Sequence, residues 1–162
     1  MVRAVFIRAS RPHELPLLVD IERAAGESFR ALGMDAVADD VPRSIEQLAP
    51  YSEDNGAFVA VDGTVRPLGY LLLDVVDGAA NVEQVSVHPE HAGRGIGRAL
   101  IERAETWARD RGLRALTLTT YVDVPWNGPY YERLGFHYLS AHEETPGLTA
   151  IRDHERRSGL DA

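Results

Sequence analysis

Apolar residues recur along this chain at two spacings, and the longer spacing of three or four residues predicts its helices. The clearest helix covers residues 96–111, where one face collects Leu100, Ile101, Ala104, Trp107 and Ala108. Gly112 follows directly and is a residue type that commonly ends a helix. The same periodicity and its flanking stop residues predict helices over 12–32, 42–49, 96–111, 129–134 and 147–157.

The shorter spacing, in which apolar and polar residues alternate, predicts the strands, which are also rich in β-branched residues. The predicted strands are 2–9, 57–61, 68–76, 82–87, 113–121 and 136–141. Asp62 and Gly63 predict a turn between the second and third strands. Because strands and helices interleave without a repeat or a linker, we expect one layered α/β domain over residues 1–162, with a mixed sheet.

Composition narrows the classes of partner. The chain has 162 residues and a formal net charge of −8, and this acidity argues against a nucleic-acid partner, which requires a basic surface. No apolar run approaches the roughly 18 residues of a membrane-spanning helix, so no membrane partner is expected. The sequence contains no cysteine, which fits a reducing cytoplasmic location. The histidine spacing matches no metal motif, and no metal is predicted.

Candidate chemistry centres on the stretch HAGRGIGRAL, residues 91–100, at the start of the clearest helix. The first turn of a helix has backbone N–H groups without intrahelical partners, and they carry partial positive charge. Gly93, Gly95 and Gly97 would let several such groups surround one anion, and Arg94 and Arg98 add charge. The alternative is a tight turn that merely needs glycine.

Spacing distinguishes between the common phosphate-binding loops. The Walker loop ends in Gly-Lys-Ser/Thr, whereas this stretch has Gly97, Arg98 and Ala99. The dinucleotide pattern G-x-G-x-x-G needs a third glycine, but Arg98 or Leu100 occupies that position, depending on the starting glycine. Both loops are therefore excluded.

Three segments together resemble the GNAT acyltransferase superfamily. VSVHPEHAGRGIGRALI is similar to its pyrophosphate loop, written Q/R-x-x-G-x-G/A, with Gly95 and Gly97 at the glycine positions and Ala92 as a departure at the first. NVEQVSVHP resembles the preceding strand, and YYERLGF resembles a later helix-to-strand motif. VPWNGPYY is similar to a subgroup signature, V-P-W-N-x-P-Y/F-Y. The resemblance implies a single GNAT-like domain, with helices flanking a mostly antiparallel sheet whose central parallel strands splay apart.

The resemblance further implies acetyl-CoA as co-substrate, bound where strands 82–87 and 113–121 separate. The pantetheine arm would pair with backbone groups of the first strand, and the pyrophosphate would bind the amides of the glycine loop. Val85 and Val87 would be plain sheet core in the alternative interpretation, and Asn127 would cap a helix. The implied cofactor-binding residues are Val85, Ser86, Val87, Gly93, Arg94, Gly95, Ile96, Gly97, Arg98 and Asn127.

The family's general-acid position corresponds to Tyr131, and Tyr130 is the second candidate. A phenol there would protonate or stabilise the leaving thiolate. Thr119 stands at one of the family's base positions, where its hydroxyl cannot act as a base.

Glu83 is therefore the candidate base that takes a proton from the amine, through water. Strand alternation predicts that it shares a face with Val85 and Val87, while Gln84 and Ser86 face the other side. A salt-bridged or edge-exposed glutamate is the alternative interpretation of Glu83.

These residues predict an N-acetyltransferase that acts on a primary amine by direct attack in a ternary complex. Glu27, Asp39 and Asp40 favour a small cationic acceptor, although solvated surface charge explains them equally well. The alternative function is a non-catalytic acyl-CoA-binding or sensor module, which needs neither Tyr131 nor Glu83.

The end of the chain departs from the family pattern, because the fold normally closes with a strand beside residues 136–141. That strand is missing, or residues 148–157 form it in place of the predicted helix, or a neighbouring chain covers the edge. An uncovered edge invites pairing between subunits, so we expect a helix and a homodimer.

Overall fold

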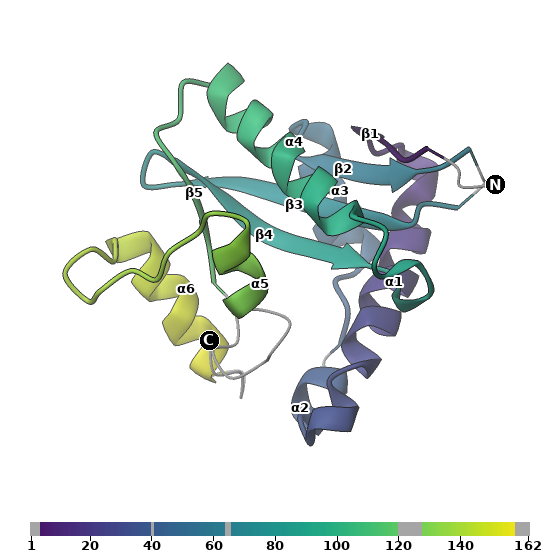
Figure 1. The fold of residues 1–162 in the computed structure, drawn as a ribbon, viewed down its shortest axis with the longest axis horizontal. Helices are drawn as coiled ribbons and strands as arrows, with labels where there is room; N and C mark the ends of the chain where they lie inside the picture. The colour runs from purple at the N-terminus through teal and green to yellow at the C-terminus, as the bar shows by residue number, and fades with distance from the viewer. Residues whose placement is uncertain (1–3, 40, 64–65, 120–127, 158–162) are drawn as a thin grey trace.

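A mixed sheet of five strands, in the order β1-β2-β3-β4-β5, forms the centre of the protein (Figure 1). The computed structural model describes residues 4–39, 41–63, 66–119 and 128–157. The first three pairings are antiparallel, and β4 pairs with β5 in parallel. The strands are β1 (Phe6–Ala9), β2 (Ala57–Val61), β3 (Gly69–Val76), β4 (Ala79–Val87) and β5 (Leu116–Leu118). The predicted α/β class with a mixed sheet is confirmed.

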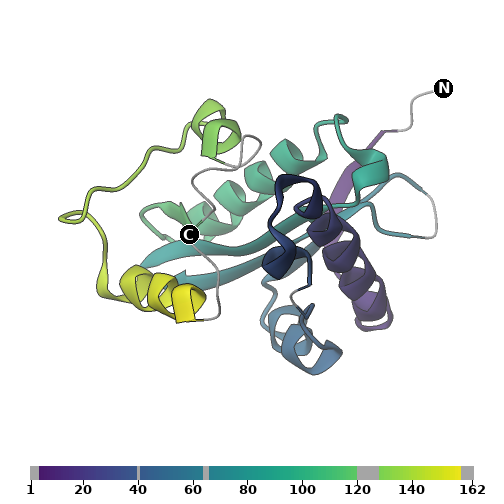
Figure 2. The same ribbon diagram turned by 90° about the horizontal axis from the view of Figure 1, so that it is seen from below.

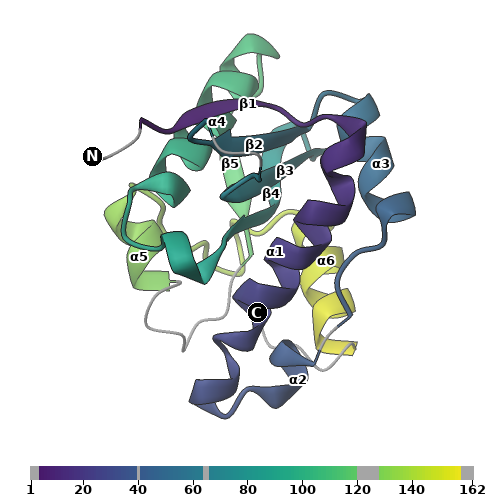
Figure 3. The same ribbon diagram turned by 90° about the vertical axis from the view of Figure 1, so that its right-hand side faces the viewer.

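Helices cover both faces of the sheet (Figure 3). Helix α4 (Ile96–Asp110) packs on one face through the five apolar residues that the sequence assigned to its inner side, and all of them are buried. The long helix predicted over 12–32 is divided into three shorter helices, and Gly33 at φ 73° ends the last of them. The other face carries α1 (Leu15–Glu27) and α3 (Ile45–Glu53), accompanied by η1 (Pro12–Glu14), η2 (Arg30–Leu32) and α2 (Asp35–Ala38).

Strands β4 and β5 separate soon after they meet. Their ladder contains the pairs Ala80–Leu116, Asn81–Thr117 and Val82–Leu118, whereas β4 continues to Val87. The predicted strand 113–121 is shorter than expected, since its described strand residues are Leu116–Leu118. One edge of residues 83–87 therefore faces no strand within the described part of the chain.

A β-bulge lies at this point of separation. Leu72 pairs with Gln84 and Leu73 pairs with Val82, so Glu83 is an extra residue in β4. A bulge shifts the alternation of side chains by one position and turns the following residues to the opposite face. The alternation of apolar and polar residues along the sequence gives no indication of where such an extra residue lies.

The predicted strand over 136–141 is wrong. Residues 136–140 have no regular structure, and 141–143 form a turn. Phe136 packs against the core, but Tyr138 and Leu139 are exposed and no neighbouring described strand offers hydrogen bonds. The segment instead passes round the β5 side of the sheet and joins α5 (Gly128–Arg133) to α6 (Pro146–Arg157) (Figure 2). The predicted final helix is confirmed, and a strand over 148–157 is excluded.

Helix α6 is fixed to the turn between β3 and β4. The Asp77 carboxylate accepts a 2.8 Å hydrogen bond from the Gly147 amide in the first turn of the helix. A Cβ atom on Gly147 would lie 2.6 Å from Asp77 Oδ2, so glycine permits this close approach. Leu148 is buried, and Arg152 pairs with Glu144 at 2.9 Å. These contacts set the position of the helix relative to β4.

We predict that Asp77→Ala loosens α6, because the first turn loses a charged hydrogen-bond acceptor. Hydrogen exchange of the α6 amides should accelerate by about fivefold, measured by mass spectrometry. Asp110→Ala, at the end of α4, is the matched control and should leave α6 exchange unchanged. Equal exchange in the two variants would contradict the proposed anchoring.

The same contact predicts a pH dependence. The nearby Thr145 hydroxyl and the hydrogen bond from the Gly147 amide lower the pKa of Asp77 below its ordinary value. Its contribution is therefore complete above the ordinary carboxyl pKa and is lost as pH falls through the lowered value. Protection of α6 should decline over that acidic interval in the native protein, but not in Asp77→Ala.

Candidate functional site

A cleft of about 1330 Å³ opens where β4 and β5 separate. Residues 82–87 of β4 line it, together with the loop before α4 and parts of α1, α5 and α6. Figure 3 shows α5 on the α4 side of the sheet and α6 on the α1 side, so the cleft lies between elements from both layers. Most of the predicted site is brought together here. The predicted site residues that line the cleft are Val85, Ser86, Val87, Gly93, Gly95, Ile96, Gly97, Glu83 and Tyr131.

The glycines around the start of α4 serve two different purposes. Gly93 and Gly95 have φ values of 79° and 74°, and a Cβ atom at either position would meet no other atom within 4 Å, so backbone conformation requires glycine there. Gly97 is required by packing, because a Cβ there would lie 2.7 Å from the Tyr130 hydroxyl oxygen. The helix begins at Ile96 and leaves its first backbone amides without intrahelical partners. Successive amides in this conformation suit an anion such as pyrophosphate.

The two arginines of the loop are not among the residues that line the cleft. Arg94 lies 3.5 Å from Asp62 and 3.4 Å from the His91 ring nitrogen. The exposed Arg98 side chain is 3.9 Å from Glu102, one helical turn away. In this loop the residues that line the cleft offer partial positive charge through their backbone amides, whereas the Arg94 and Arg98 side chains lie outside the lining. Anion binding by either arginine stays a prediction.

The β4 edge supplies backbone groups to the same cleft. Val85 and Val87 pack towards the α4 side of the core, while Ser86 is buried and accepts a 2.6 Å hydrogen bond from Gln84. Beyond Val82, no described strand pairs with β4 on the β5 side. Unpaired strand groups can accept an extended ligand arm in the manner of an added strand. The structure therefore fits the arm of coenzyme A here.

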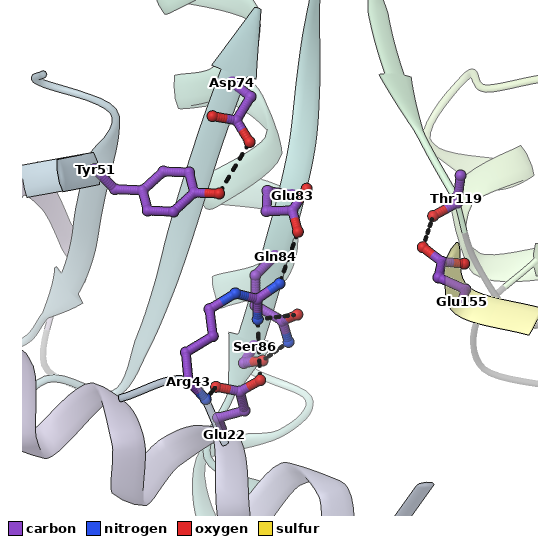
Figure 4. Close-up of polar contacts among 9 residues, drawn as sticks. All are labelled: Glu22, Arg43, Tyr51, Asp74, Glu83, Gln84, Ser86, Thr119 and Glu155. Carbon is purple, nitrogen blue, oxygen red and sulfur yellow. Dashed lines mark hydrogen bonds and ion pairs between the residues drawn. The ribbon is translucent and has the colours of Figure 1, made fainter. Parts of the chain in front are cut away.

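The structure corrects the placement of Glu83. Because of the bulge, Glu83 lies on the side of Gln84 and not on the side of Val85 and Val87 as predicted. Arg43 donates hydrogen bonds to both, at 2.8 Å to Glu83 and 3.2 Å to Gln84 (Figure 4). The alternative interpretation, in which Glu83 is salt-bridged, describes the observed contact.

Arg43 connects three elements at this wall of the cleft. It precedes α3 and pairs with Glu22 of α1 at 3.0 Å and with Glu83 of β4 at 2.8 Å (Figure 4). Burial raises the pKa of the Glu83 carboxyl above its ordinary value, and the Arg43 guanidinium opposes that rise. Sequence reasoning missed Arg43 and Glu22, since residues 21 and 40 positions apart show no spacing signal.

The opposite wall carries a second polar contact. Thr119, directly after β5, donates a 2.7 Å hydrogen bond to Glu155 of α6 (Figure 4). Both residues line the cleft. Sequence reasoning treated Thr119 as a position without a base, and it had no signal for Glu155 because that residue's role depends on where α6 lies.

Two tyrosines of α5 complete the cleft. The Tyr131 ring packs edge-on against Tyr130 at 5.3 Å and against Phe136 at 5.8 Å between ring centroids. Burial raises the pKa of the Tyr131 phenol far above its ordinary value, and Tyr130 raises it further. The phenol is therefore protonated at neutral pH and has a proton to donate. Asn127 lies outside the described residues, as does most of the VPWNGPYY segment.

Two of the three acidic residues expected beside the acceptor, Glu27 and Asp39, do not line the cleft. Exposed Glu27 and Asp39 pair with Arg30 at 3.1 and 2.6 Å, and Asp40 is outside the described residues. Across the described ranges, no group of three or more histidine, aspartate or glutamate side chains is arranged to hold a metal ion. Within the same ranges, no helix is long and apolar enough to cross a membrane.

Comparisons with known proteins agree with this geometry. A model of the acetyltransferase (GNAT) family matches residues 18–136. IAA acetyltransferase of Azospirillum brasilense is 39% identical over 74 residues, 46% of this chain and 48% of that protein. Streptothricin acetyltransferase of Streptomyces lavendulae is 36% identical over 86 residues, 51% of this chain and 45% of that protein. The match thus spans less than half the length of these curated relatives.

Solved structures share the fold. The PaiA N-acetyltransferase from Thermoplasma acidophilum, in complex with coenzyme A, has a TM-score of 0.73 at 17% identity and covers 89% of this chain and 94% of that one. A GNAT family acetyltransferase from Brucella melitensis, in complex with acetyl-CoA, has a TM-score of 0.62 at 23% identity, with 90% and 93% covered. At these identities the likeness shows the fold alone.

We predict that Arg43→Gln raises the pKa of Glu83 further, because the guanidinium that opposes the effect of burial is removed. A side-chain NMR titration of Glu83 would measure this shift. Arg23→Gln is the matched control, since Arg23 lines the same cleft but pairs with Asp20 at 3.9 Å. An unchanged Glu83 titration in Arg43→Gln would contradict the assigned contact.

The stability of the Arg43→Gln variant follows from the same shift. At pH 7 its free energy of unfolding should fall by roughly 1–3 kcal/mol, because two carboxylates lose their partner. The pKa of Glu83 in the folded variant would lie above its value in the unfolded chain. At a pH between these two values, the folded state therefore binds more protons than the unfolded state. Stability of the variant should therefore decline as pH rises through that interval, as urea unfolding would show.

Proposed function

Because the chain belongs to the acetyltransferase (GNAT) family, we propose that it transfers the acetyl group of acetyl-CoA to a primary amine of a small molecule. The amine attacks the thioester directly in a ternary complex. The observation that carries the proposal is the β4 edge beyond Val82, which no described strand pairs with on the β5 side and which shares one cleft with the glycine loop. Two relatives are named for small molecules, IAA and streptothricin, which supports an acceptor of that size.

The donor is held by backbone groups in this proposal. Residues 85–87 of β4 pair with the pantetheine arm, and the amides from Gly93 to Arg98 bind the pyrophosphate. Asn127 lies outside the described residues, and its contact with the arm stays a prediction from the sequence. Backbone recognition explains why Ala92 is tolerated at a position where the family pattern has a longer polar residue. No amide is lost by that change.

The chemistry depends first on holding the amine and the thioester in reactive geometry. Tyr131 supplies a proton to the leaving thiolate, which suits a partly buried, protonated phenol in the cleft. Glu83 lies where the strands separate and is the base indicated by the sequence, but its carboxylate is already paired with Arg43. A predicted homodimer, a cytoplasmic location and the VPWNxPYY subgroup stay predictions from the sequence.

We predict that the purified protein releases free coenzyme A from acetyl-CoA in the presence of a suitable amine, detected with a thiol reagent across an amine panel. Gly95→Ala should weaken coenzyme A binding about tenfold, because a side chain at positive φ disturbs the loop. Gly112→Ala is a matched control with φ 66° at the other end of α4, and should bind normally. A failure to bind coenzyme A at millimolar concentration would refute the proposal.

We predict that Tyr131→Phe lowers turnover by about 100-fold while the dissociation constant for coenzyme A stays unchanged, because the phenol acts only on the leaving group. Steady-state kinetics and calorimetry would separate the two effects. Tyr138→Phe is the control, since Tyr138 is exposed and outside the cleft lining. Binding without turnover for any amine, in the native protein, would favour the non-catalytic acyl-CoA-binding module.

A further inference from the structure

Two of the carboxylates that line the cleft, Glu83 and Glu155, belong to different walls. Glu83 lies on β4, and Glu155 lies on α6 beside the end of β5 (Figure 4). The two are close enough for the charge of Glu155 to raise the pKa of Glu83. The point where β4 and β5 separate therefore has an acidic group on each side.

Glu83 and Glu155 have different kinds of hydrogen-bond partner, one charged and one neutral. Glu83 is engaged by the guanidinium of Arg43, a permanent cation that stabilises the charged carboxylate and opposes the rise of its pKa on burial. Glu155 accepts a hydrogen bond at one oxygen from the neutral Thr119 hydroxyl. Among the described residues, Glu155 has no ion pair and its second oxygen has no hydrogen bond.

The position of Glu155 is built into the fold. Helix α6 is anchored at its first turn by Asp77 and buries Leu148. Two turns further on, the same helix places Glu155 against Thr119 in the cleft lining. A strand at the end of the chain would not hold this carboxylate against Thr119.

We propose that Glu155 is the group that takes the proton from the acceptor's ammonium, directly or through one water, and that Thr119 is its positioning residue. This inference rests on the proposed acetyl transfer. Arg43, Glu22 and Glu83 then form the structural wall of the acceptor pocket. The acceptor is an amine that is protonated at neutral pH, drawn to the carboxylate not already paired with an arginine.

The step balances without any further reactant. Glu155 takes one proton from the ammonium, and the neutral nitrogen then forms the C–N bond while the C–S bond of the thioester breaks. Tyr131 gives its phenol proton to the leaving sulfur. The proton that the nitrogen sheds on becoming an amide returns to the Tyr131 oxygen through water. Glu155 finally releases its proton to solvent.

The electrostatic surroundings of Glu155 come from every neighbouring element. The charged and titratable residues that line the cleft beside Glu155 include Glu22, Arg23, Arg43, Glu83, Tyr130, Tyr131 and His154, and Asp74 acts on Glu83. A pH profile alone would mix their titrations. The test therefore compares variants that differ by one group.

Glu155→Gln keeps the side-chain shape but cannot accept a proton. At pH 7 we expect kcat/KM for a reactive amine to fall about 100-fold, with coenzyme A binding unchanged. The deficit should shrink as pH rises towards the pKa of the amine itself, about 10 for an alkyl amine, because the acceptor then needs no base. The activity of the variant should rise steadily with pH, because without the base only the free amine can attack.

Thr119 and Glu83 supply the discriminating variants. Thr119→Val should lower kcat/KM about tenfold, and Thr119→Ser, which restores the hydroxyl, should recover it. Glu83→Gln should cost less than Glu155→Gln. Glu105→Gln is a matched control, because Glu105 is an exposed helical glutamate of α4 outside the cleft lining.

Activity of Glu155→Gln within about threefold of the native protein, or a larger and pH-dependent loss in Glu83→Gln, would overturn the inference and leave acetyl transfer standing. A native protein that fails to bind coenzyme A or to acetylate any amine refutes the proposed function, and the inference falls with it. Loss of coenzyme A binding in Glu155→Gln would assign the residue a structural role and also overturn the inference.

Discussion

The separation of β4 from β5 is the constraint on which the rest of the site depends. Parallel pairing ends at Val82 and Leu118, and the bulge at Glu83 lies at the next position of β4. A strand that loses its neighbour must satisfy its backbone groups in another way. Here those groups line a cleft that extends to the start of α4. The separation of the two strands therefore provides a strand edge for an extended ligand arm and connects that edge to the anion site.

Charge in the cleft is distributed by tertiary contacts and not by local sequence. Arg43 connects α1 and β4 through Glu22 and Glu83, and it stabilises the charged form of a carboxylate whose pKa burial raises. On the other wall, Thr119 supplies a neutral hydrogen bond to Glu155. Two glutamates in one cleft thus have different chemical character, because one faces a guanidinium and the other faces a hydroxyl.

The presence of helix α6, in place of a closing strand, changes which side chains line the cleft. Residues 136–140 form no strand, and the chain passes round the sheet to α6, which Asp77 holds at the turn between β3 and β4 (Figure 2). Because α6 ends beside the open part of the sheet, it adds Glu155 to the cleft. A chain closed by a paired strand would place different side chains there.

Features that depend on local periodicity and on backbone conformation could be predicted from the order of residues. The buried face of α4, the β2 strand and the α6 helix follow from spacing, and Gly93 and Gly95 follow from the positive φ that their turn requires. The face of Glu83 could not be predicted, since a bulge is set by the pairing of β3 with β4 and reverses the simple alternation. Tertiary packing also determines that residues 136–140 form no strand and which partners Arg43 and Glu155 contact. Hydrogen bonds and ion pairs between distant segments exist only after those segments come together, so the sequence alone does not indicate them.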